Sequence, residues 1–371
     1  MSGTREREIG IIGGGIIGLS IAWQCARAGM QVTLLEKENV GVGTSSVAAG
    51  MLAPEAEVDF GEEALMKLSR RSLGLYPSFL EELKEDALEF VPELDPCGTI
   101  LVGKDRDDVE RLNRLYRFRQ ELGLRVEWWG GDLAREHCEL LSPRVNSAIW
   151  LPEDAQIDNR RLLQALKEGA QKQGAVLKEA CEVKAYEKDP DGALFRVHTD
   201  NATASFDDLV LCAGAWSEGI EGQGGYSSLH PVKGQILTLG RIEGSGLGAM
   251  IRSPRAYLVP KADGSLRVGG TSEETGFDLT ATAGGVRELL EEAWELVPAV
   301  QDAPFHSVEV GLRPAHRDHR PFIGRRGNGA LQATGHYRHG FLLAPLTAYS
   351  VRDALKGADI PAPFQGMDKE G

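Results

Sequence analysis

Cysteine is scarce in this chain of 371 residues, and the few cysteines follow no pattern of spacing. The five, Cys25, Cys97, Cys138, Cys181 and Cys212, contain no C-x-x-C pair and no set spaced like zinc ligands. A disulfide-bonded secreted fold is therefore not expected, whereas scattered reduced thiols are typical of a cytoplasmic protein. His316 and His319 are three residues apart, but no third ligand is near them, so no metal site is predicted.

Long apolar runs and an excess of positive charge are also missing. No stretch approaches the roughly 18 apolar residues of a membrane-spanning helix, and the N-terminus has no clean signal-peptide cleavage site. Lys and Arg number 41 against 55 Asp and Glu, which gives a net charge of −14. This charge disfavours nucleic acid and anionic membranes as main partners, although local arginines could still bind a small anion. We expect a cytoplasmic protein with no nucleic-acid or membrane partner.

The remaining composition is that of an ordinary globular protein. Apolar residues make up 42% and charged residues 26% of the chain, with no repeat and no low-complexity linker. A chain of this length exceeds what one hydrophobic core usually supports, so two closely connected domains are expected.

The most informative stretch is EIGIIGGGIIGLSIAWQCARAGMQVTLLE at 8–36, which is typical of a nucleotide-binding βαβ unit. Gly13, Gly15 and Gly18 have the G-x-G-x-x-G spacing between an apolar strand and a helix. The helix N-terminus offers unpaired N–H groups to a pyrophosphate, and Glu36 at the tip of the second strand can bind a ribose diol. The unit predicts an adenine dinucleotide but does not distinguish NAD from FAD.

Further along the chain, the pattern alternates between two kinds of structure. Residues 62–85 read as an amphipathic helix interrupted near Pro77, and 176–187 and 194–199 as paired strands. A helix is expected within 156–173, with Asp158 as its N-cap. Long alternating strands between about 228 and 311 favour an antiparallel sheet, while 209–213, 330–334 and a helix from Gly340 return to β–α character.

Two arginines near the C-terminus are candidates for binding an anion. Arg313 lies at the end of an alternating strand, and Arg338 lies in a turn bracketed by Gly335 and Gly340. Two guanidinium groups converging on one cavity would make a forked clamp for a carboxylate, which lysine could not reproduce.

Several motifs together point to a known family. IIGGGIIG, TSSVAAGMLAP, DDLVLCAGAWS, LHPVKGQILTL, YLVPKADGSLRVGGT, GLRP and GHYRHGFLLAP span nearly the whole chain. With them the chain resembles the D-amino-acid-oxidase-like family of FAD enzymes, and within it the bacterial glycine oxidases of thiamine biosynthesis. The resemblance implies an α/β fold. A Rossmann-type, glutathione-reductase-like FAD domain (1–86, 145–222 and 308–371) would be interleaved with a mostly antiparallel α+β substrate domain (87–144 and 223–307).

The resemblance also implies FAD as the cofactor, bound non-covalently. Covalent attachment in related sarcosine oxidases uses a cysteine in the C-terminal region, and no cysteine follows Cys212. The helix near Gly340 would aim its positive end at the flavin N1/C2 carbonyl side. The residues carried over to cofactor binding are Gly13, Gly15, Ile16, Ile17, Gly18, Glu36, Lys37, Thr44, Ser45, Ala49, Gly50, Met51, Val183, Gly214, Trp216, His336, Tyr337, Arg338, His339, Gly340, Phe341 and Leu342.

For the substrate, the resemblance implies Tyr257, Arg313 and Arg338, with Arg313 pairing with the carboxylate of a small amino acid. The expected reaction passes a hydride from the substrate Cα to flavin N5, with no side-chain base. Hydrolysis of the imine would give a 2-oxo acid and ammonia, and O2 would be reduced to H2O2. Related enzymes are homo-oligomers, often tetramers.

Two positions depart from the family pattern, so other functions stay open. Arg255 replaces a common histidine and Ser272 replaces a methionine of some relatives. Arg255 could bind a second carboxylate or face solvent. Alternatives to glycine oxidation are oxidation of another D-amino acid or N-methyl amino acid, the flavin domain of a tRNA-modifying enzyme, and a non-catalytic FAD-binding scaffold.

Overall fold

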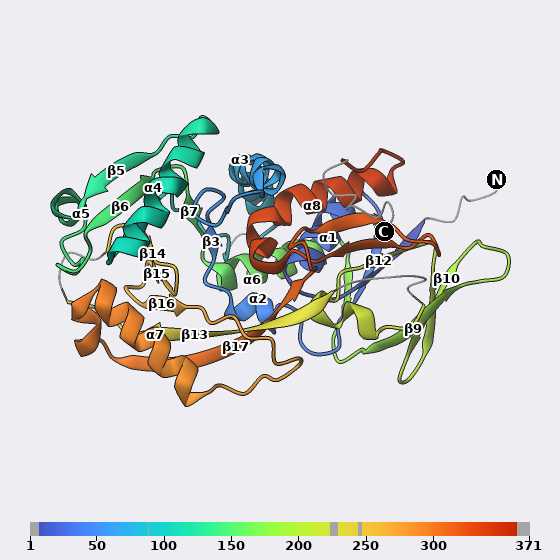
Figure 1. The fold of residues 1–371 in the computed structure, drawn as a ribbon. Helices are drawn as coiled ribbons and strands as arrows, with labels where there is room; N and C mark the ends of the chain where they lie inside the picture. The colour runs from blue at the N-terminus through green and yellow to red at the C-terminus, as the bar shows by residue number, and fades with distance from the viewer. Residues whose placement is uncertain (1–6, 88, 223–228, 244–246, 362–371) are drawn as a thin grey trace.

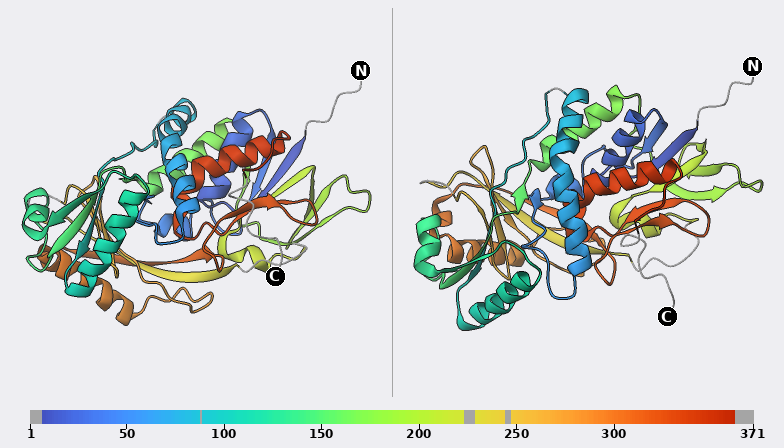
Figure 2. Two further views of the ribbon diagram at one scale, coloured as in Figure 1. Left: turned by 45° about the horizontal axis from the view of Figure 1, so that its top comes forward. Right: turned by 90° about the horizontal axis from the view of Figure 1, so that it is seen from above.

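A computed structural model describes residues 7–87, 89–222, 229–243 and 247–361, so the predicted domain stretches 1–6, 223–228 and 362–371 lie outside the description. The chain folds into two units that lie side by side, as Figures 1 and 2 show. One unit contains a mostly parallel sheet covered by helices, and the other a larger, mostly antiparallel sheet. This is the mixed α/β architecture expected from the sequence. None of the helices in the described ranges is long and apolar enough to cross a bilayer.

The parallel sheet is built around the predicted βαβ unit. Its strands, in spatial order, are β18 (Phe322–Arg325), β19 (Leu331–Thr334), β12 (Asp208–Leu211), β1 (Glu8–Ile12), β2 (Gln31–Leu35) and β8 (Val176–Lys178). All neighbours are parallel except the edge pair β18–β19. The central strands are apolar and buried on both faces, as a parallel sheet requires.

Helices pack on one face of this sheet and form the largest hydrophobic core. They are α1 (Ile16–Arg27), α3 (Glu63–Asp86), α6 (Asn159–Lys172) and α8 (Gly340–Leu355). Trp23 of α1 is fully buried, meets Phe79 edge-on at 4.9 Å, and donates a 2.8 Å hydrogen bond to Asp86. The Asp158 side chain accepts a hydrogen bond from the Arg161 backbone N–H, so the predicted N-cap of α6 is confirmed.

The predicted interruption of helix α3 near Pro77 is wrong. The helix has 24 residues and continues without a break through the proline. A proline inside a helix removes one backbone hydrogen bond, which is why an interruption was expected. Here tertiary packing compensates: Tyr76 and Phe79 are completely buried on either side of the proline. The Tyr76 hydroxyl also donates a hydrogen bond to the Phe341 carbonyl, which ties α3 to α8.

The other face of the parallel sheet is covered by a small antiparallel sheet of β9 (Val183–Lys188), β10 (Phe195–Thr199) and β11 (Thr203–Phe206). The region 176–187, expected as one strand, is split between two sheets. β8 joins the parallel sheet beside β2, whereas β9 pairs with β10. Between them Ala180 has a left-handed φ of 49°, which turns the chain from one layer to the other.

The second unit is an eight-stranded sheet. Its strands, in spatial order, are β17 (Phe305–Ala315), β13 (His230–Leu239), β16 (Leu266–Gly269), β15 (Tyr257–Pro260), β14 (Met250–Arg252), β4 (Thr99–Gly103), β6 (Ser147–Leu151) and β5 (Glu127–Gly130). Only β14–β4 is parallel among its described pairs. The helices α4 (Arg106–Glu121), α5 (Gly131–His137) and α7 (Ala283–Leu296) and the short η2 (Pro298–Asp302) lie in this unit (Figure 1).

The two units exchange segments along the chain. β6 belongs to the larger sheet although it follows residue 145, and β17 crosses residue 308 within that sheet. The long pair β13–β17 extends from the larger sheet towards the helices that cover the parallel sheet (Figures 1 and 2). The predicted boundary at 144/145 therefore lies just before β6, and the one at 307/308 lies inside β17. The division of the chain into these two domains stays a prediction.

Candidate active site

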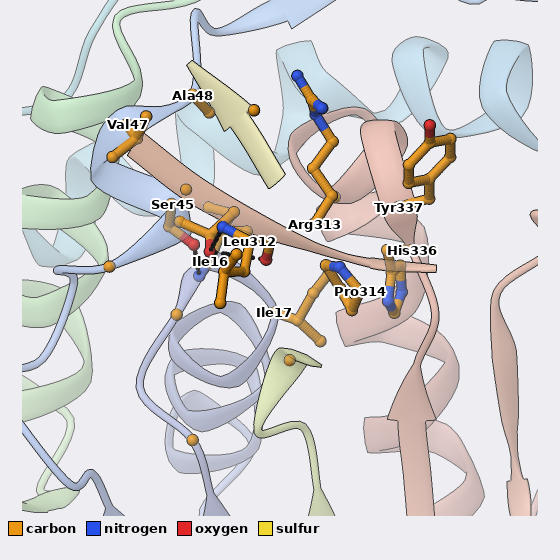
Figure 3. Close-up of a pocket in the computed structure, with 18 of the residues that line it drawn as sticks. Ile16, Ile17, Ser45, Val47, Ala48, Leu312, Arg313, Pro314, His336 and Tyr337 are labelled. Carbon is orange, nitrogen blue, oxygen red and sulfur yellow. Dashed lines mark hydrogen bonds between the residues drawn. The ribbon is translucent and has the colours of Figure 1, made fainter. Parts of the chain in front are cut away.

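A cavity of about 630 Å³ lies where the two units meet, a volume within the usual range for cofactor sites. Its walls come from the glycine turn after β1, the segment 42–51, the loop before β9, the turn after β12, and strands β13, β15 and β17. Of all the residues predicted to bind cofactor or substrate, only Gly18, His339 and Leu342 do not line it. Figure 3 shows residues from three of these wall segments facing one another.

The glycine turn forms the phosphate end of the cavity. Gly13 has a φ of +106°, and its N–H donates a 2.9 Å hydrogen bond to the Leu35 carbonyl. Gly15 is the N-cap residue of α1; it has no side chain with which to cap the helix, and no acid lies in the first turn. The positive end of the helix dipole is thus left to a bound anion such as a pyrophosphate. Gly18 packs instead: a Cβ there would lie 1.9 Å from the Gly13 carbonyl oxygen.

Glu36 stands at the tip of β2 beside this turn. Its carboxylate accepts hydrogen bonds from the backbone N–H groups of Gly14 at 2.6 Å and Glu38 at 3.0 Å. These bonds orient the carboxylate at the cavity wall, where a ribose diol could bind it. Next to it, the Lys37 ammonium lies 3.6 Å from the centre of the Trp216 ring. Trp216 belongs to the 3₁₀ turn η1 (Gly214–Gly219).

The short helix α2 (Thr44–Val47) connects the phosphate end to the larger sheet. The Ser45 hydroxyl accepts a 3.0 Å hydrogen bond from the Ile16 backbone N–H (Figure 3). The Thr44 hydroxyl donates to the Leu312 carbonyl at 2.8 Å and accepts from the Leu312 N–H at 3.1 Å. These bonds hold α1, α2 and β17 in fixed relation around the cavity.

The segment 49–51, which follows α2, is held in place by contacts with Ile157. Gly50 has a φ of +78°, and a Cβ there would lie 2.0 Å from the Ile157 carbonyl oxygen. The Ile157 N–H donates to the Gly50 carbonyl at 2.9 Å, and the two-residue strands β3 (Met51–Leu52) and β7 (Ala155–Gln156) pair beside it. The cavity-facing backbone at 49–51 is therefore rigidly positioned.

Two cations of the β15–β16 hairpin support this segment, and sequence analysis missed both. The Lys261 ammonium donates to the Ala49 carbonyl at 2.5 Å and to the Gln156 side-chain oxygen at 3.2 Å. Burial lowers the pKa of Lys261 to about 8. The buried Arg267 donates to the Val47 carbonyl at 2.7 Å and pairs with Glu309 at 2.6 Å. A charged residue within or beside a buried strand was the signal available in the sequence.

At the other end of the cavity, Arg313 and Tyr257 converge. A Cβ on Gly270 would lie 2.9 Å from Arg313 Nη2 and 3.1 Å from the Tyr257 hydroxyl oxygen. Arg313 Nη1 donates to the Thr271 carbonyl at 2.9 Å, which orients the guanidinium. Burial raises the pKa of Tyr257, so its hydroxyl stays protonated and can donate a hydrogen bond. These two groups could bind one carboxylate.

The C-terminal turn brings a second helix N-terminus to the cavity. Tyr337 has a left-handed φ of 49° and stacks on His319 at 4.6 Å. α8 starts at Gly340 with no side-chain cap and no acid in its first turn, so its positive end is unopposed. Behind it, burial lowers the pKa of His336 to about 3, which keeps this imidazole neutral beside Thr347 at 3.0 Å.

Glu57 is the main site residue that sequence analysis missed. It lines the cavity, is 7% exposed, and pairs with Arg252 at 3.2 Å. Burial alone would raise the pKa of Glu57, but the Arg252 and Arg338 guanidinium groups outweigh burial and hold the pKa below its usual range. Arg338 Nη2 reaches the Glu57 carbonyl oxygen at 3.5 Å.

The two departures from the family pattern have different surroundings. Ser272 lines the cavity. Arg255 also lies at its edge, but its side chain is 61% exposed and pairs with Glu292 at 3.1 Å. The positive charge of Arg255 is therefore already paired with the Glu292 carboxylate.

Comparison with known proteins agrees with this geometry. Residues 8–354 match the family model DAO, described as FAD dependent oxidoreductase. The chain is 31% identical to the glycine oxidase of Geobacillus kaustophilus over 95% of this chain and 94% of that protein. A crystal structure of glycine oxidase from that organism superposes with a TM-score of 0.91, covering 98% of this chain and all of that one.

A second relative is the bifunctional protein ThiO/ThiG of Trichormus variabilis, 33% identical over 94% of this chain. The chain spans about half of that protein, 52% of its length. The cavity residues fit FAD, because two helix N-termini without an acid in the first turn, an oriented acidic residue and a rigid glycine segment line one cavity. The chain is an FAD-dependent enzyme and belongs to the DAO family of FAD-dependent oxidoreductases.

Proposed function

We propose that this enzyme oxidises glycine, and secondarily sarcosine or other small amines, with O2 as the electron acceptor. The observation that carries the proposal is the convergence of Arg313 and Tyr257 on Gly270 inside the cofactor cavity. A forked guanidinium and a hydroxyl directed at one point suit a carboxylate. The glycine oxidase relatives support the same substrate class.

FAD held by the glycine turn, residues 49–51 and the turn 336–341 would supply the two-electron chemistry of this proposal, with O2 as the final electron acceptor. The side chains and helix N-termini of the protein orient the substrate and stabilise the charge that develops during the reaction. Arg313 and Tyr257 hold the carboxylate, so that the amino acid has one orientation in the cavity. The N-terminus of α8 provides positive potential for negative charge that develops on the cofactor. No side-chain base is assigned, because the neutral amine of the substrate can drive hydride loss.

Within the cofactor site, we assign Glu36 and Lys37 to the adenosine end, and Gly13 to Ile17 with Ser45 to the pyrophosphate. Residues 49–51 and the turn 336–341 would surround the flavin. His339 and Leu342 would then act by supporting the turn from behind, since neither lines the cavity.

The relative ThiO/ThiG supports a place in thiamine biosynthesis, with the imine of glycine as the useful product. A cytoplasmic location and a tetrameric assembly remain predictions that accompany this function.

The test is a visible spectrum of the purified protein without oxygen, before and after addition of glycine. We expect the flavin absorbance to bleach, to recover in air, and to yield H2O2. A flavin that glycine and sarcosine leave oxidised would refute the proposal. A panel of D-amino acids and N-methyl amino acids, ranked by bleaching rate, tests whether another small amino acid is the preferred substrate. A tRNA-binding assay at low salt tests whether the chain is the flavin domain of a tRNA-modifying enzyme.

A further inference from the structure

The loop between β16 and α7, which we call the strap (272–282), lies along the large cavity. It contains no helix, and its one strand-like contact is the bridge between Glu273 and Lys233 of β13. Its two large apolar side chains, Phe277 and Leu279, are 55% and 53% exposed, although both line the cavity. Exposed apolar atoms beside a cavity lose their contact with water when a ligand occupies it. The strap therefore presents apolar surface to whatever fills the cavity.

The base of the strap is fixed to β13 through Gln235, whose side chain is fully buried. The Gln235 side-chain amide donates to the Glu273 carboxylate at 2.8 Å and to the Thr282 hydroxyl at 3.0 Å. The Gln235 side-chain oxygen accepts a 2.9 Å hydrogen bond from the Thr282 backbone N–H. One buried amide thus joins the two ends of the strap.

The middle of the strap is fixed by Lys233, a second buried side chain of β13. Its ammonium donates to the Asp278 carboxylate at 2.7 Å and lies 3.6 Å from the Glu273 carboxylate. The hydrogen bond from Lys233 lowers the pKa of Asp278 to about 2, so the pair stays ionised at neutral pH. Asp278 stands between Phe277 and Leu279 in the sequence. The ion pair therefore fixes the part of the strap that carries both apolar side chains.

The strap also contacts the parallel-sheet unit. The Phe277 ring lies 5.9 Å from the Trp216 ring, between their centres, and Trp216 belongs to the η1 turn after β12. On the same indole ring lies the Lys37 ammonium, next in the chain to Glu36. Trp216, Lys37 and Glu36 all line the cavity. The strap therefore reaches the end of the cavity that we assign to the adenosine of FAD.

We propose that the strap is part of the cofactor site. Phe277 and Leu279 pack on FAD near its adenosine end and exclude water from it, and the Lys233–Asp278 pair holds them in place. This role rests on the orientation of FAD given under the proposed function and on no property of the substrate.

The expected effect of the strap is slower release of FAD. The Phe277 and Leu279 side chains are about half exposed, so a ligand against them can remove a substantial apolar area from water. Contacts that form only in the complex act mainly on the dissociation rate. The polar groups at the glycine turn and Glu36 would position FAD, and the strap would retain it.

The test measures release of FAD from the holoenzyme without substrate, by recovery of flavin fluorescence on dilution. Phe277→Ser should raise the dissociation constant at least about fivefold, mainly through faster release, because about half of an aromatic side chain loses its cover. Phe305→Ser is the matched control, since Phe305 is 51% exposed but does not line the cavity. Its dissociation constant should stay within about twofold of that of the parent enzyme.

The ion pair is tested separately with Asp278→Asn, which should release FAD at least about threefold faster, because a charge-assisted hydrogen bond is lost. Glu274→Gln is its control, since it removes a carboxylate from another exposed position of the strap. Asp278→Glu keeps the charge and should restore slow release. Release from Asp278→Asn that is no faster than from Glu274→Gln would overturn the anchoring role of the pair.

A dissociation constant of Phe277→Ser within twofold of the parent value would overturn the cofactor role of the strap. An equal rise in Phe305→Ser would overturn it too, because the effect would then not depend on the cavity. Glycine oxidation plays no part in these measurements. An enzyme that fails to oxidise glycine would refute the proposed function and leave the role of the strap standing.

Discussion

The ammonium group of Lys261 lies 2.5 Å from the carbonyl oxygen of Ala49, directly behind the backbone that lines the cofactor cavity. The same group donates to the Ile157 carbonyl at 3.3 Å, so one cation joins the two segments that hold Gly50. Lys261, next to a strand of the eight-stranded sheet, thus positions a cavity-lining segment that lies 212 residues earlier in the chain.

Lys261→Met should weaken FAD binding by roughly 10-fold, since a charged hydrogen bond is worth about 1.5–3 kcal/mol. The dissociation constant can be measured by recovery of flavin fluorescence on dilution. Lys104→Met is the control, because Lys104 is also a buried lysine, paired with Glu292 away from the cavity. Equal loss of FAD in both variants would indicate general destabilisation rather than support of the segment.

Arg313→Met should lower kcat/KM for glycine by roughly 100-fold while FAD remains bound, because loss of a forked charged contact costs about 1.5–3 kcal/mol or more. Steady-state peroxide production and the flavin spectrum report the two properties separately. Arg255→Met, an exposed arginine at the same cavity, should change kcat/KM less than threefold. Retained glycine oxidation in Arg313→Met would remove Arg313 from the carboxylate clamp.

Tyr257→Phe should have a smaller effect, a loss of roughly fivefold in kcat/KM for glycine, because one neutral hydrogen bond is worth about 0.5–1.5 kcal/mol. The phenylalanine ring keeps the packing of the partly buried tyrosine against Gly269, so stability should change little. The measurement is the kcat/KM of both proteins together with their melting temperatures. A loss as large as that of Arg313→Met would assign Tyr257 a greater role than one donor.

Gly50→Ala should abolish or severely weaken FAD binding, because its Cβ would lie 2.0 Å from the Ile157 carbonyl oxygen. Gly29→Ala is the matched control: Gly29 also has a positive φ, +81°, but an added methyl group there would have no atom within 4 Å. The control should be less stable by about 1 kcal/mol from backbone strain and should keep its flavin. The flavin content of both purified proteins decides the comparison.

Stability should fall as the pH rises from about 4.5 to 7, partly through Glu55. Burial, with the nearby charge of Asp154, raises the pKa of Glu55 to about 7. The folded state therefore binds more protons than the unfolded state in this range, and stability declines until both states are ionised. Glu55→Gln should flatten the decline by about 1–3 kcal/mol between pH 5 and 8.

Urea unfolding at several pH values measures this slope. Glu153→Gln is the control, because Glu153 contacts the same Arg70 but is 45% exposed. A slope that Glu55→Gln leaves unchanged would show that Glu55 does not titrate in this range.

The sequence by itself determined the features that depend on local spacing. The glycine turn and the acidic residue at the tip of β2 are joined by hydrogen bonds within one βαβ unit, and the cap of α6 bonds to a backbone N–H three residues away. Their periodicity and residue types are readable without knowing the rest of the fold. The alternation of apolar and polar residues likewise indicated the antiparallel sheet.

Only the tertiary structure decided which distant side chains meet. The pairing of β15 with β16 and of β13 with β17 places Tyr257 and Arg313 on Gly270, although 56 positions separate them in the chain. Glu57, Arg252 and Lys261 carry no local motif, and their roles come from contacts between segments about 200 residues apart in the chain, since 195 residues separate Glu57 from Arg252 and 212 separate Ala49 from Lys261. Strand register and burial set these contacts, because a buried charge is stable only where the fold supplies its partner.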